Sequence, residues 1–261
     1  MIGVIDSGIS GLFVMQVLRD HLPAYDLVFL ADTARGPYGG KSVETIQAFS
    51  TESIQMLIDL GATLIIAACP MISALMVECR IGPFDVPVFN TVEPAVETAV
   101  RVSTHQRIGI LGVQCDFEKR AYEQKILKLN PDAKIHAISS PLLESIVTEG
   151  WSGRPEAAMI TKKYLHPLKV RQIDTLILAR NHYRVLKKTI QRKIGKFVKL
   201  VEPWEVLAGH VKAYLIEHKK IESTLGKTGN RRFLVTDRAS QIELSAGIFY
   251  DRRIKLEKIL L

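Results

Sequence analysis

Short apolar segments rich in β-branched residues alternate along the chain with longer stretches of helical periodicity. The apolar segments lie at residues 3–5, 27–30, 64–68, 86–89, 107–111, 134–138, 175–179 and 197–201. Continuous apolar runs of this length are typical of strands covered on both faces. The amphipathic stretches between them include residues 11–21, 42–60, 93–102, 117–129 and 204–218. This alternation predicts an α/β protein with mainly parallel sheets and right-handed crossovers.

The order of the predicted strands repeats coarsely in the two halves of the chain. In the first half, predicted strands end at Asp6-Ser7-Gly8 and at Ala68-Cys69. In the second half, the corresponding ends are Gly112-Val113-Gln114 and Ala179-Arg180. The repeat predicts two pseudo-symmetric α/β lobes. Because ligands of parallel sheets bind beyond the carboxyl ends of the strands, these polar ends are the candidate functional residues.

Composition and charge narrow the class of protein. The chain is 47% hydrophobic and 24% charged, no apolar run reaches the roughly 18 residues of a membrane span, and the N-terminus has no signal-peptide pattern. We therefore expect a cytoplasmic protein that makes no membrane contact. Residues 1–95 hold 4 Lys and Arg against 10 Asp and Glu, whereas the remainder holds 31 against 17. The basic runs are either a solvated helix face or the surface for an anionic partner, such as nucleic acid or an acidic protein.

The three cysteines are too few and too irregularly spaced for a disulfide framework or a zinc site, so we expect no metal. In a reducing compartment they are either buried small hydrophobes, or one of them is a nucleophile or base.

Several motifs resemble those of glutamate racemases, in the aspartate/glutamate racemase family, and they occur in that family's order. They are Asp6-Ser7-Gly8-Ile9-Ser10-Gly11-Leu12, the stretch from Ala31 to Ser42, Glu93-Pro94-Ala95, Ser140-Pro141-Leu142-Leu143, Glu149-Gly150-Trp151, His182-Tyr183 and Leu256-Glu257-Lys258. The resemblance covers residues 2 to about 258, which is nearly the whole chain.

This resemblance implies two α/β lobes with an active-site cleft between them. The first lobe would comprise residues 1–95 and a returning segment at 205–261, and the second residues 96–204. The residue pattern by itself predicts a loop at 219–231 and, from 232 to 256, a helix and an edge strand added to either lobe. The resemblance also implies a cofactor-independent isomerase that interconverts L- and D-glutamate for peptidoglycan synthesis. A small amino-acid or dicarboxylate ligand and a homodimer are further implications.

Racemisation explains why the family uses two thiols. The α-proton must leave from one face of the carbon and return to the other, so two acid/base groups must flank the substrate. The resemblance assigns the first cysteine to Cys69, whereas Cys79 and Cys115 match no catalytic position of the family and are interpreted as packing residues. The position of the second is occupied by Arg180, which keeps its proton at any biological pH and is a very poor relay.

Other positions also bear on the expected site. The resemblance makes Asp6 and Glu149 the acidic partners of the two thiols and His182 the neighbouring histidine. Where the family has Asn-Thr after the first cysteine, this chain has Pro70-Met71, which removes polar groups that bind substrate. The substrate-contacting positions would be Ser7, Pro37, Tyr38, Gly39 and Asn181.

Some family positions match and others depart from the family pattern, and three functions are compatible with this combination. The chain is an active glutamate racemase with a substitute base such as His182, a one-cysteine enzyme in which Arg180 binds a second carboxylate, or a binding or regulatory protein that has lost catalysis. We expect racemase activity to be lost or strongly reduced. We also expect Cys69 and Arg180 to face each other across one cleft, with Arg180 lowering the pKa of the Cys69 thiol.

Overall fold

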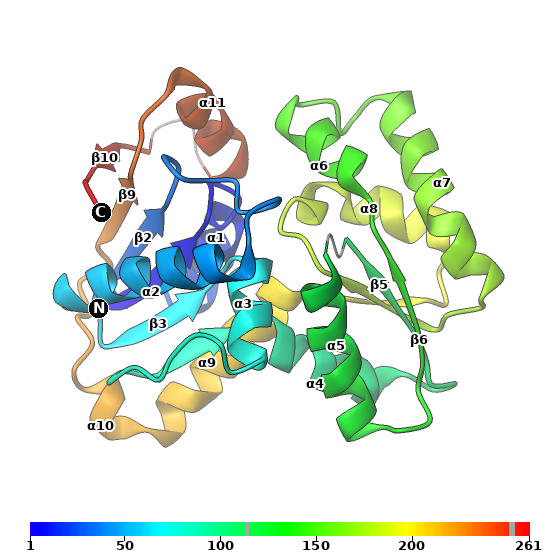
Figure 1. The fold of residues 1–261 in the computed structure, drawn as a ribbon, viewed down its shortest axis with the longest axis horizontal. Helices are drawn as coiled ribbons and strands as arrows, with labels where there is room; N and C mark the ends of the chain where they lie inside the picture. Colours follow the sequence, from blue (N-terminus) through cyan, green and yellow to red (C-terminus); the bar gives the residue numbers. More distant parts are fainter. Residues whose placement is uncertain (113–114, 251–253) are drawn as a thin grey trace. The chain divides into compact units, whose positions relative to one another are not determined.

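The computed structural model describes residues 1–112, 115–250 and 254–261. Within these residues the chain forms two compact units. Unit 1 comprises residues 1–91 and 207–261, and unit 2 comprises residues 92–206. Each unit is built on its own sheet (Figure 1). The domain boundaries predicted from the sequence, 1–95 with 205–261 and 96–204, stay a prediction.

The sheet of unit 1 has six parallel strands in the order β10-β9-β2-β1-β3-β4. Their bounds are β1 (Ile2–Asp6), β2 (Leu27–Ala31), β3 (Leu64–Ala67), β4 (Val88–Asn90), β9 (Arg231–Val235) and β10 (Leu256–Lys258). The central strands β1, β2 and β3 are buried along their whole length, as their continuous apolar runs predict.

Helices cover both faces of this sheet. Their bounds are α1 (Leu12–His21), α2 (Val43–Asp59), α3 (Pro70–Val77), α9 (Pro203–Glu217), which continues from unit 2, α10 (Lys219–Glu222) and α11 (Ser240–Phe249). Helix α2 packs on α3, and α1 packs on α11. Since parallel strands are joined by right-handed crossovers, the two pairs lie on opposite faces.

The C-terminal segment differs in part from the sequence prediction. The loop expected at 219–231 begins with the short helix α10, because Ile221, Glu222 and Ser223 close helical backbone hydrogen bonds to His218 and Lys219. The segment beyond it adds two strands and α11 to unit 1. The edge strand is β10, while β9 lies inside the sheet between β2 and β10.

Unit 2 has a four-stranded parallel sheet in the order β6-β5-β7-β8. Its strands are β5 (Arg107–Leu111), β6 (Lys134–Ile138), β7 (Thr175–Leu178) and β8 (Lys199–Val201). Its helices are α4 (Val92–Val102), α5 (Asp116–Leu129), α6 (Pro141–Thr148), α7 (Pro155–Val170) and α8 (Tyr183–Ile194). Helices α4 and α5 pack together, as do α7 and α8. The two pairs cover opposite faces of the sheet.

In both units, the polar residues named from the sequence follow strands that are neighbours in the sheet. Asp6 ends β1, and Cys69 follows the adjacent β3. Arg180 follows β7, which pairs with β5. The expected end of β5 at Val113 and Gln114 lies outside the described residues, and Gly112 is the last described residue there. In the part of the chain that is described, no helix is long and apolar enough to cross a membrane.

Candidate functional site

The thiol of Cys69 lies at the junction of β3 and α3. Cys69 is the N-cap residue of α3, and Pro70 occupies the first turn, where the missing N–H of proline costs no helical hydrogen bond. The side chain is 2% exposed, and its Sγ lies 3.1 Å from the Oγ of Ser7. Met71 is buried in the same turn. The adjacent ends of β1 and β3 thus bring one hydroxyl and one thiol together.

The carboxylate of Asp6 is buried beside this pair. Its Oδ2 accepts hydrogen bonds from the Gly11 N–H at 2.5 Å and the Ser10 Oγ at 3.1 Å, and its Oδ1 accepts one from the Ser7 N–H at 3.0 Å. A Cβ on Gly11 would lie 2.7 Å from the Cβ of Asp6, so this close approach requires glycine. Burial raises the pKa of Asp6 to about 6, although these hydrogen bonds oppose the rise.

Burial and the neighbouring charge of Asp6 raise the pKa of the Cys69 thiol to about 11. The hydroxyl of Ser7 and the backbone N–H groups of Ile72 and Ser7 favour the thiolate but do not reverse this direction. The expected effect of Arg180 on the pKa of Cys69 stays a prediction. Cys69 is a protonated thiol at neutral pH, with a carboxylate beside it that titrates near neutrality.

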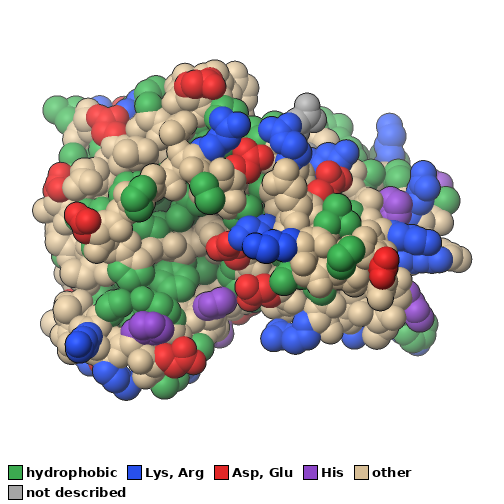
Figure 2. All heavy atoms as spheres, turned by 60° about the horizontal axis from the view of Figure 1, so that its bottom comes forward, with side chains coloured by type: hydrophobic (Ala, Val, Ile, Leu, Met, Phe, Trp, Pro, Cys, Tyr) green, Lys and Arg blue, Asp and Glu red, His purple; other side chains and the backbone are tan. Residues whose placement is uncertain are grey.

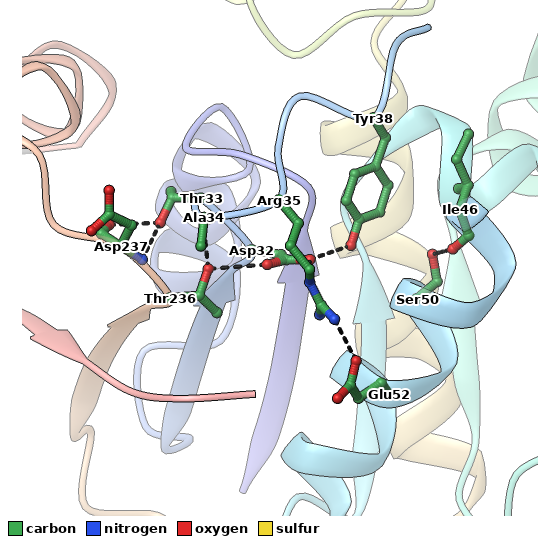
Figure 3. Close-up of polar contacts among 10 residues, drawn as sticks. All are labelled: Asp32, Thr33, Ala34, Arg35, Tyr38, Ile46, Ser50, Glu52, Thr236 and Asp237. Atoms are coloured by element: carbon green, nitrogen blue, oxygen red, sulfur yellow. Dashed lines mark hydrogen bonds and ion pairs between the residues drawn. The ribbon is translucent and has the colours of Figure 1, made fainter. Parts of the chain in front are cut away.

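Asp32 supports the loop that carries the second family motif. It is fully buried, and its Oδ2 accepts hydrogen bonds from the Nε of Arg35 and the OH of Tyr38, both at 2.7 Å (Figure 3). Its Oδ1 accepts a hydrogen bond from the Oγ1 of Thr236 at 3.0 Å, and Arg35 also pairs with Glu52. These bonds tie the loop after β2 to the end of β9.

Tyr38 is part of this support. Its ring is completely buried, and burial together with the hydrogen bond to Asp32 raises its pKa. Pro37 and Gly39, on either side, are exposed. The side chain of Tyr38 thus fixes the loop, while its neighbours are open to solvent. The roles of Ser7, Pro37, Tyr38 and Gly39 in contacting a substrate stay predictions.

In unit 2, the position expected for the second thiol holds a buried ion cluster. Arg180 is 5% exposed, and its Nη1 and Nη2 donate to the Oε1 and Oε2 of Glu118 at 2.6 and 2.8 Å. Its Nε lies 2.9 Å from the Oε1 of Glu144, an ion pair rather than an aligned hydrogen bond. Glu118 comes from the first turn of α5, and Glu144 from α6. The two carboxylates raise the pKa of the guanidinium against the effect of burial.

This cluster changes what Arg180 can do. A planar guanidinium binds a carboxylate best through two parallel N–H donors, and here that fork already holds Glu118. One arginine and two glutamates carry a formal charge of −1. Gly112 also lies close, because a Cβ there would be 2.8 Å from the Cγ of Arg180 and the residue has φ +107. The ion pairs and the close packing thus make Arg180 a structural residue inside unit 2.

Sequence reasoning missed Glu118 and Glu144. The available signal was the arginine itself, because an arginine after a buried strand requires a carboxylate partner when it is itself buried. Glu118 is the natural choice, since it follows β5, the strand paired with β7. The family motif instead predicted Glu149 as the acidic residue at this position.

Glu149 is exposed at the C-terminal end of α6, where its N–H bonds to the carbonyl of Ser145. Its assignment as an acidic partner stays a prediction.

Cys115 is half-buried at the N-terminal end of α5, and its Sγ donates to the Oε2 of Glu118 at 3.4 Å. Burial and the carboxylate of Glu118 raise its pKa to about 12. Cys79 is exposed, with a left-handed backbone of φ +56. Neither cysteine is part of the apolar core, so their interpretation as packing residues does not describe their environment.

The residues that follow Arg180 are also partly or fully buried. His182 is the N-cap residue of α8, and burial together with the positive charge of Arg180 lowers its pKa to about 4. Asn181 is buried. The OH of Tyr183 lies 2.6 Å from the Oγ of Ser140 and braces the strand tip against the start of α6. His182 is consequently a neutral imidazole at physiological pH.

The described residues include no group of three or more His, Cys, Asp or Glu side chains arranged to hold a metal ion.

The arrangement defines an α/β protein of two parallel-sheet units, with a thiol–carboxylate cluster in unit 1 and an arginine–glutamate cluster in unit 2. The family described as Asp/Glu/Hydantoin racemase matches residues 2–211, and the chain belongs to this family. It is 34% identical over 258 residues to the glutamate racemase of Persephonella marina, covering 99% of this chain and 96% of that one. The resemblance seen in the sequence motifs is thereby confirmed.

Solved structures agree with this assignment. Glutamate racemase isoform RacE1 from Bacillus anthracis matches with a TM-score of 0.90 and 28% identity, covering 100% of this chain and 97% of that chain. Glutamate racemase from Francisella tularensis in complex with D-glutamate matches with a TM-score of 0.87 and 30% identity, covering 99% and 96%. The predicted α/β fold class is confirmed.

Proposed function

We propose that this protein binds glutamate, or a closely related dicarboxylic amino acid, and that its racemase activity is lost or strongly reduced. The binding part rests on family membership and on relatives that are glutamate racemases, one of them crystallised with D-glutamate. As further parts of the proposal, the protein needs no cofactor, is cytoplasmic, forms a homodimer and acts in peptidoglycan metabolism, as the family resemblance implies.

Unit 1 retains the parts needed at one face of an α-carbon. A thiol next to a carboxylate with a pKa near 6 can donate a proton, and the carboxylate can receive the thiol proton when the thiol acts as the base. Ser7 orients the sulfur. These residues support proton exchange on one side of a bound amino acid.

The buried cluster of Arg180, Glu118 and Glu144 is the observation that carries the loss of racemisation. Inversion needs a second acid/base group on the opposite face, and the position assigned to it holds a guanidinium paired with two carboxylates. A group in this state neither takes nor gives a proton at neutral pH. Removing one member of a coupled catalytic pair usually removes most of the rate.

The alternative of an active racemase with His182 as the second base finds less support. A base is most effective when its pKa lies near the working pH, and that of His182 is lowered to about 4. The alternative in which Arg180 binds a second substrate carboxylate is also weakened, because its paired donors already hold Glu118.

A one-thiol enzyme is the second candidate function. It is favoured by the intact contact between Cys69 and Ser7 beside Asp6, which a protein without catalysis has no chemical need to keep. Such an enzyme would exchange or deliver a proton on one face without inverting the carbon.

Two measurements on the purified protein test the proposal. Saturation-transfer NMR with L- and D-glutamate reports binding, and circular dichroism at fixed wavelength follows loss of optical rotation from D-glutamate. The Persephonella marina enzyme serves as the positive control for turnover. We expect a binding signal with at most trace racemisation. Turnover comparable with that of the control would refute the proposed loss, and no binding of either enantiomer would refute the proposed ligand.

A further inference from the structure

The formal charge of the chain is concentrated in one unit. Residues 92–206 hold 20 Lys and Arg against 12 Asp and Glu, whereas the remaining residues hold 15 of each. The whole net charge of +8 therefore belongs to unit 2. Within residues 155–199, 12 Lys and Arg stand against only 2 Asp and Glu. Figure 2 shows numerous Lys and Arg side chains on the surface of unit 2.

Helices α7 and α8 carry eight of the 12 Lys and Arg in residues 155–199. The two helices pack side by side on one face of the unit 2 sheet, and both run against the direction of its strands. The exposed residues of α7 include Lys162, Lys163 and Lys169, and those of α8 include Lys187, Lys188 and Arg192. Side chains three or four residues apart on a helix lie on the same face, so Lys188 and Arg192 lie together on α8.

A groove of about 540 Å³ runs along α8 and ends in the loop that follows it. It is lined by Lys187, Lys188, Gln191, Arg192 and Lys196, which are four cations and one amide. Among the described residues, no carboxylate lines it. Lys187 pairs with Glu202, at 2.5 Å, which leaves Lys188, Arg192 and Lys196 as its principal positive charges.

An aromatic side chain stands beside the end of this groove. Phe197 is 84% exposed, and the Nζ of Lys196 lies 5.0 Å from the centre of its ring. The loop that presents it is braced, because the Nε2 of Gln191 donates to the carbonyls of Gly195 at 2.8 Å and Val198 at 3.0 Å. A large apolar ring held in water on a fixed loop gains nothing for stability and offers a flat surface for stacking.

We propose that the α8 groove and Phe197 form a binding surface for single-stranded nucleic acid. Phosphates would lie along Lys188, Arg192 and Lys196, and a base would stack on Phe197. This combination of a basic groove and an exposed aromatic ring is how single strands are bound without sequence preference. A row of cations alone would fit any polyanion, and the braced aromatic ring favours nucleic acid over an acidic protein.

Fluorescence anisotropy with a fluorescein-labelled oligothymidylate of 20 nucleotides tests the proposal on the full chain. We expect binding that weakens as salt rises, with a slope of log K against log[salt] of about −2 for three neutralised phosphates. The charge-reversal variant Lys188→Glu/Arg192→Glu should bind at least about 10-fold more weakly. Phe197→Ser should weaken binding by about 5-fold or more at unchanged salt slope, since one stacked base contributes roughly 1–3 kcal/mol.

The matched control is Lys219→Glu/Lys220→Glu, which reverses an exposed basic pair on α10 in unit 1. It changes the net charge of the chain equally and should leave the affinity within about 2-fold. Equal loss in both double variants would overturn the proposal, because it would show a general charge effect. Poly-L-glutamate of matched charge that binds as tightly as the oligonucleotide, or an affinity unchanged in Phe197→Ser, would also overturn it.

Discussion

Arg180 and Glu118 form a two-pronged ion pair inside unit 2, with the guanidinium nitrogens 2.6 and 2.8 Å from the two carboxylate oxygens. Arg180 occupies the position where related racemases are expected to present their second thiol. The arginine is thus accompanied by one carboxylate from the first turn of α5 and by a second one, Glu144, from α6. Replacing Arg180 alone would remove the cation that pairs with both Glu118 and Glu144. Arg180 is therefore part of the internal packing of unit 2.

Removing one partner of this pair should destabilise the protein. Glu118→Ala leaves a buried guanidinium with only one carboxylate, and we expect a loss of about 3 kcal/mol or more in the free energy of unfolding, measured by urea denaturation. Glu123→Ala on the same helix removes a partly exposed pair with Lys119 and should cost no more than about 1 kcal/mol. Equal effects of the two variants would contradict a structural role for the Arg180–Glu118 pair.

Restoring the second thiol should require several changes together. Arg180→Cys alone removes the guanidinium that pairs with the buried carboxylate of Glu118, so we expect an unstable protein without measurable racemisation. Adding Glu118→Gln should recover stability. Adding Asn181→Thr, Pro70→Asn and Met71→Thr should give the first measurable turnover in a circular dichroism assay, since catalytic residues that act as a unit are strongly non-additive. Robust turnover by Arg180→Cys alone would show that the surrounding residues do not matter.

Asp6 should make stability depend on pH in a defined window. Its pKa is raised from 3.8 to about 6 in the fold, so the folded state binds the proton more tightly than the unfolded chain. The contribution of Asp6 to stability is largest below about pH 4 and falls as pH rises to about 6, by at most about 3 kcal/mol. We expect the difference in unfolding free energy between the protein and Asp6→Asn to decline across this window. A difference that is flat, or that grows with pH, would contradict the raised pKa.

The raised pKa of Cys69 predicts slow alkylation at neutral pH. With a pKa of about 11, little thiolate is present at pH 7–9, and the sulfur is also buried. Mass spectrometry after iodoacetamide treatment should show exposed Cys79 modified well before Cys69. Asp6→Asn removes the nearby negative charge and should accelerate modification of Cys69, with Cys79 as the internal control. Rapid modification of Cys69 at pH 7 would contradict this account of the thiol.

Much of the fold could be read from the pattern of apolar runs. Strands such as β1, β2 and β5 are buried on both faces, and their continuous apolar sequences reveal them directly. The short helix α10 was missed because a segment of four residues is too short to carry a periodic signal. Long-range pairing is harder to predict, because a position along the chain does not show which strand ends meet in the sheet.

The candidate site shows the same division. Cys69 and Asp6 could be named from motifs at strand ends, and the structure places their neighbour Ser7 3.1 Å from the sulfur. The pairing of Arg180 with Glu118 could not, since it depends on β5 and β7 being neighbours and on both side chains being buried. The raised pKa of Cys69 likewise depends on burial and on the nearby Asp6 carboxylate, which the sequence alone does not give. The expected juxtaposition of Cys69 and Arg180 stays a prediction.

The central claim is that one face of a bound amino acid has a working acid/base group and the other has none. Proton NMR of the α-hydrogen of L- and D-glutamate, each incubated separately with the protein in deuterated water, tests it most directly. We predict that exchange affects one enantiomer, proceeds without inversion and disappears in Cys69→Ser. Deuterium entering both enantiomers with formation of the mirror-image product would contradict the claim, because it would require a second acid/base group in addition to Cys69.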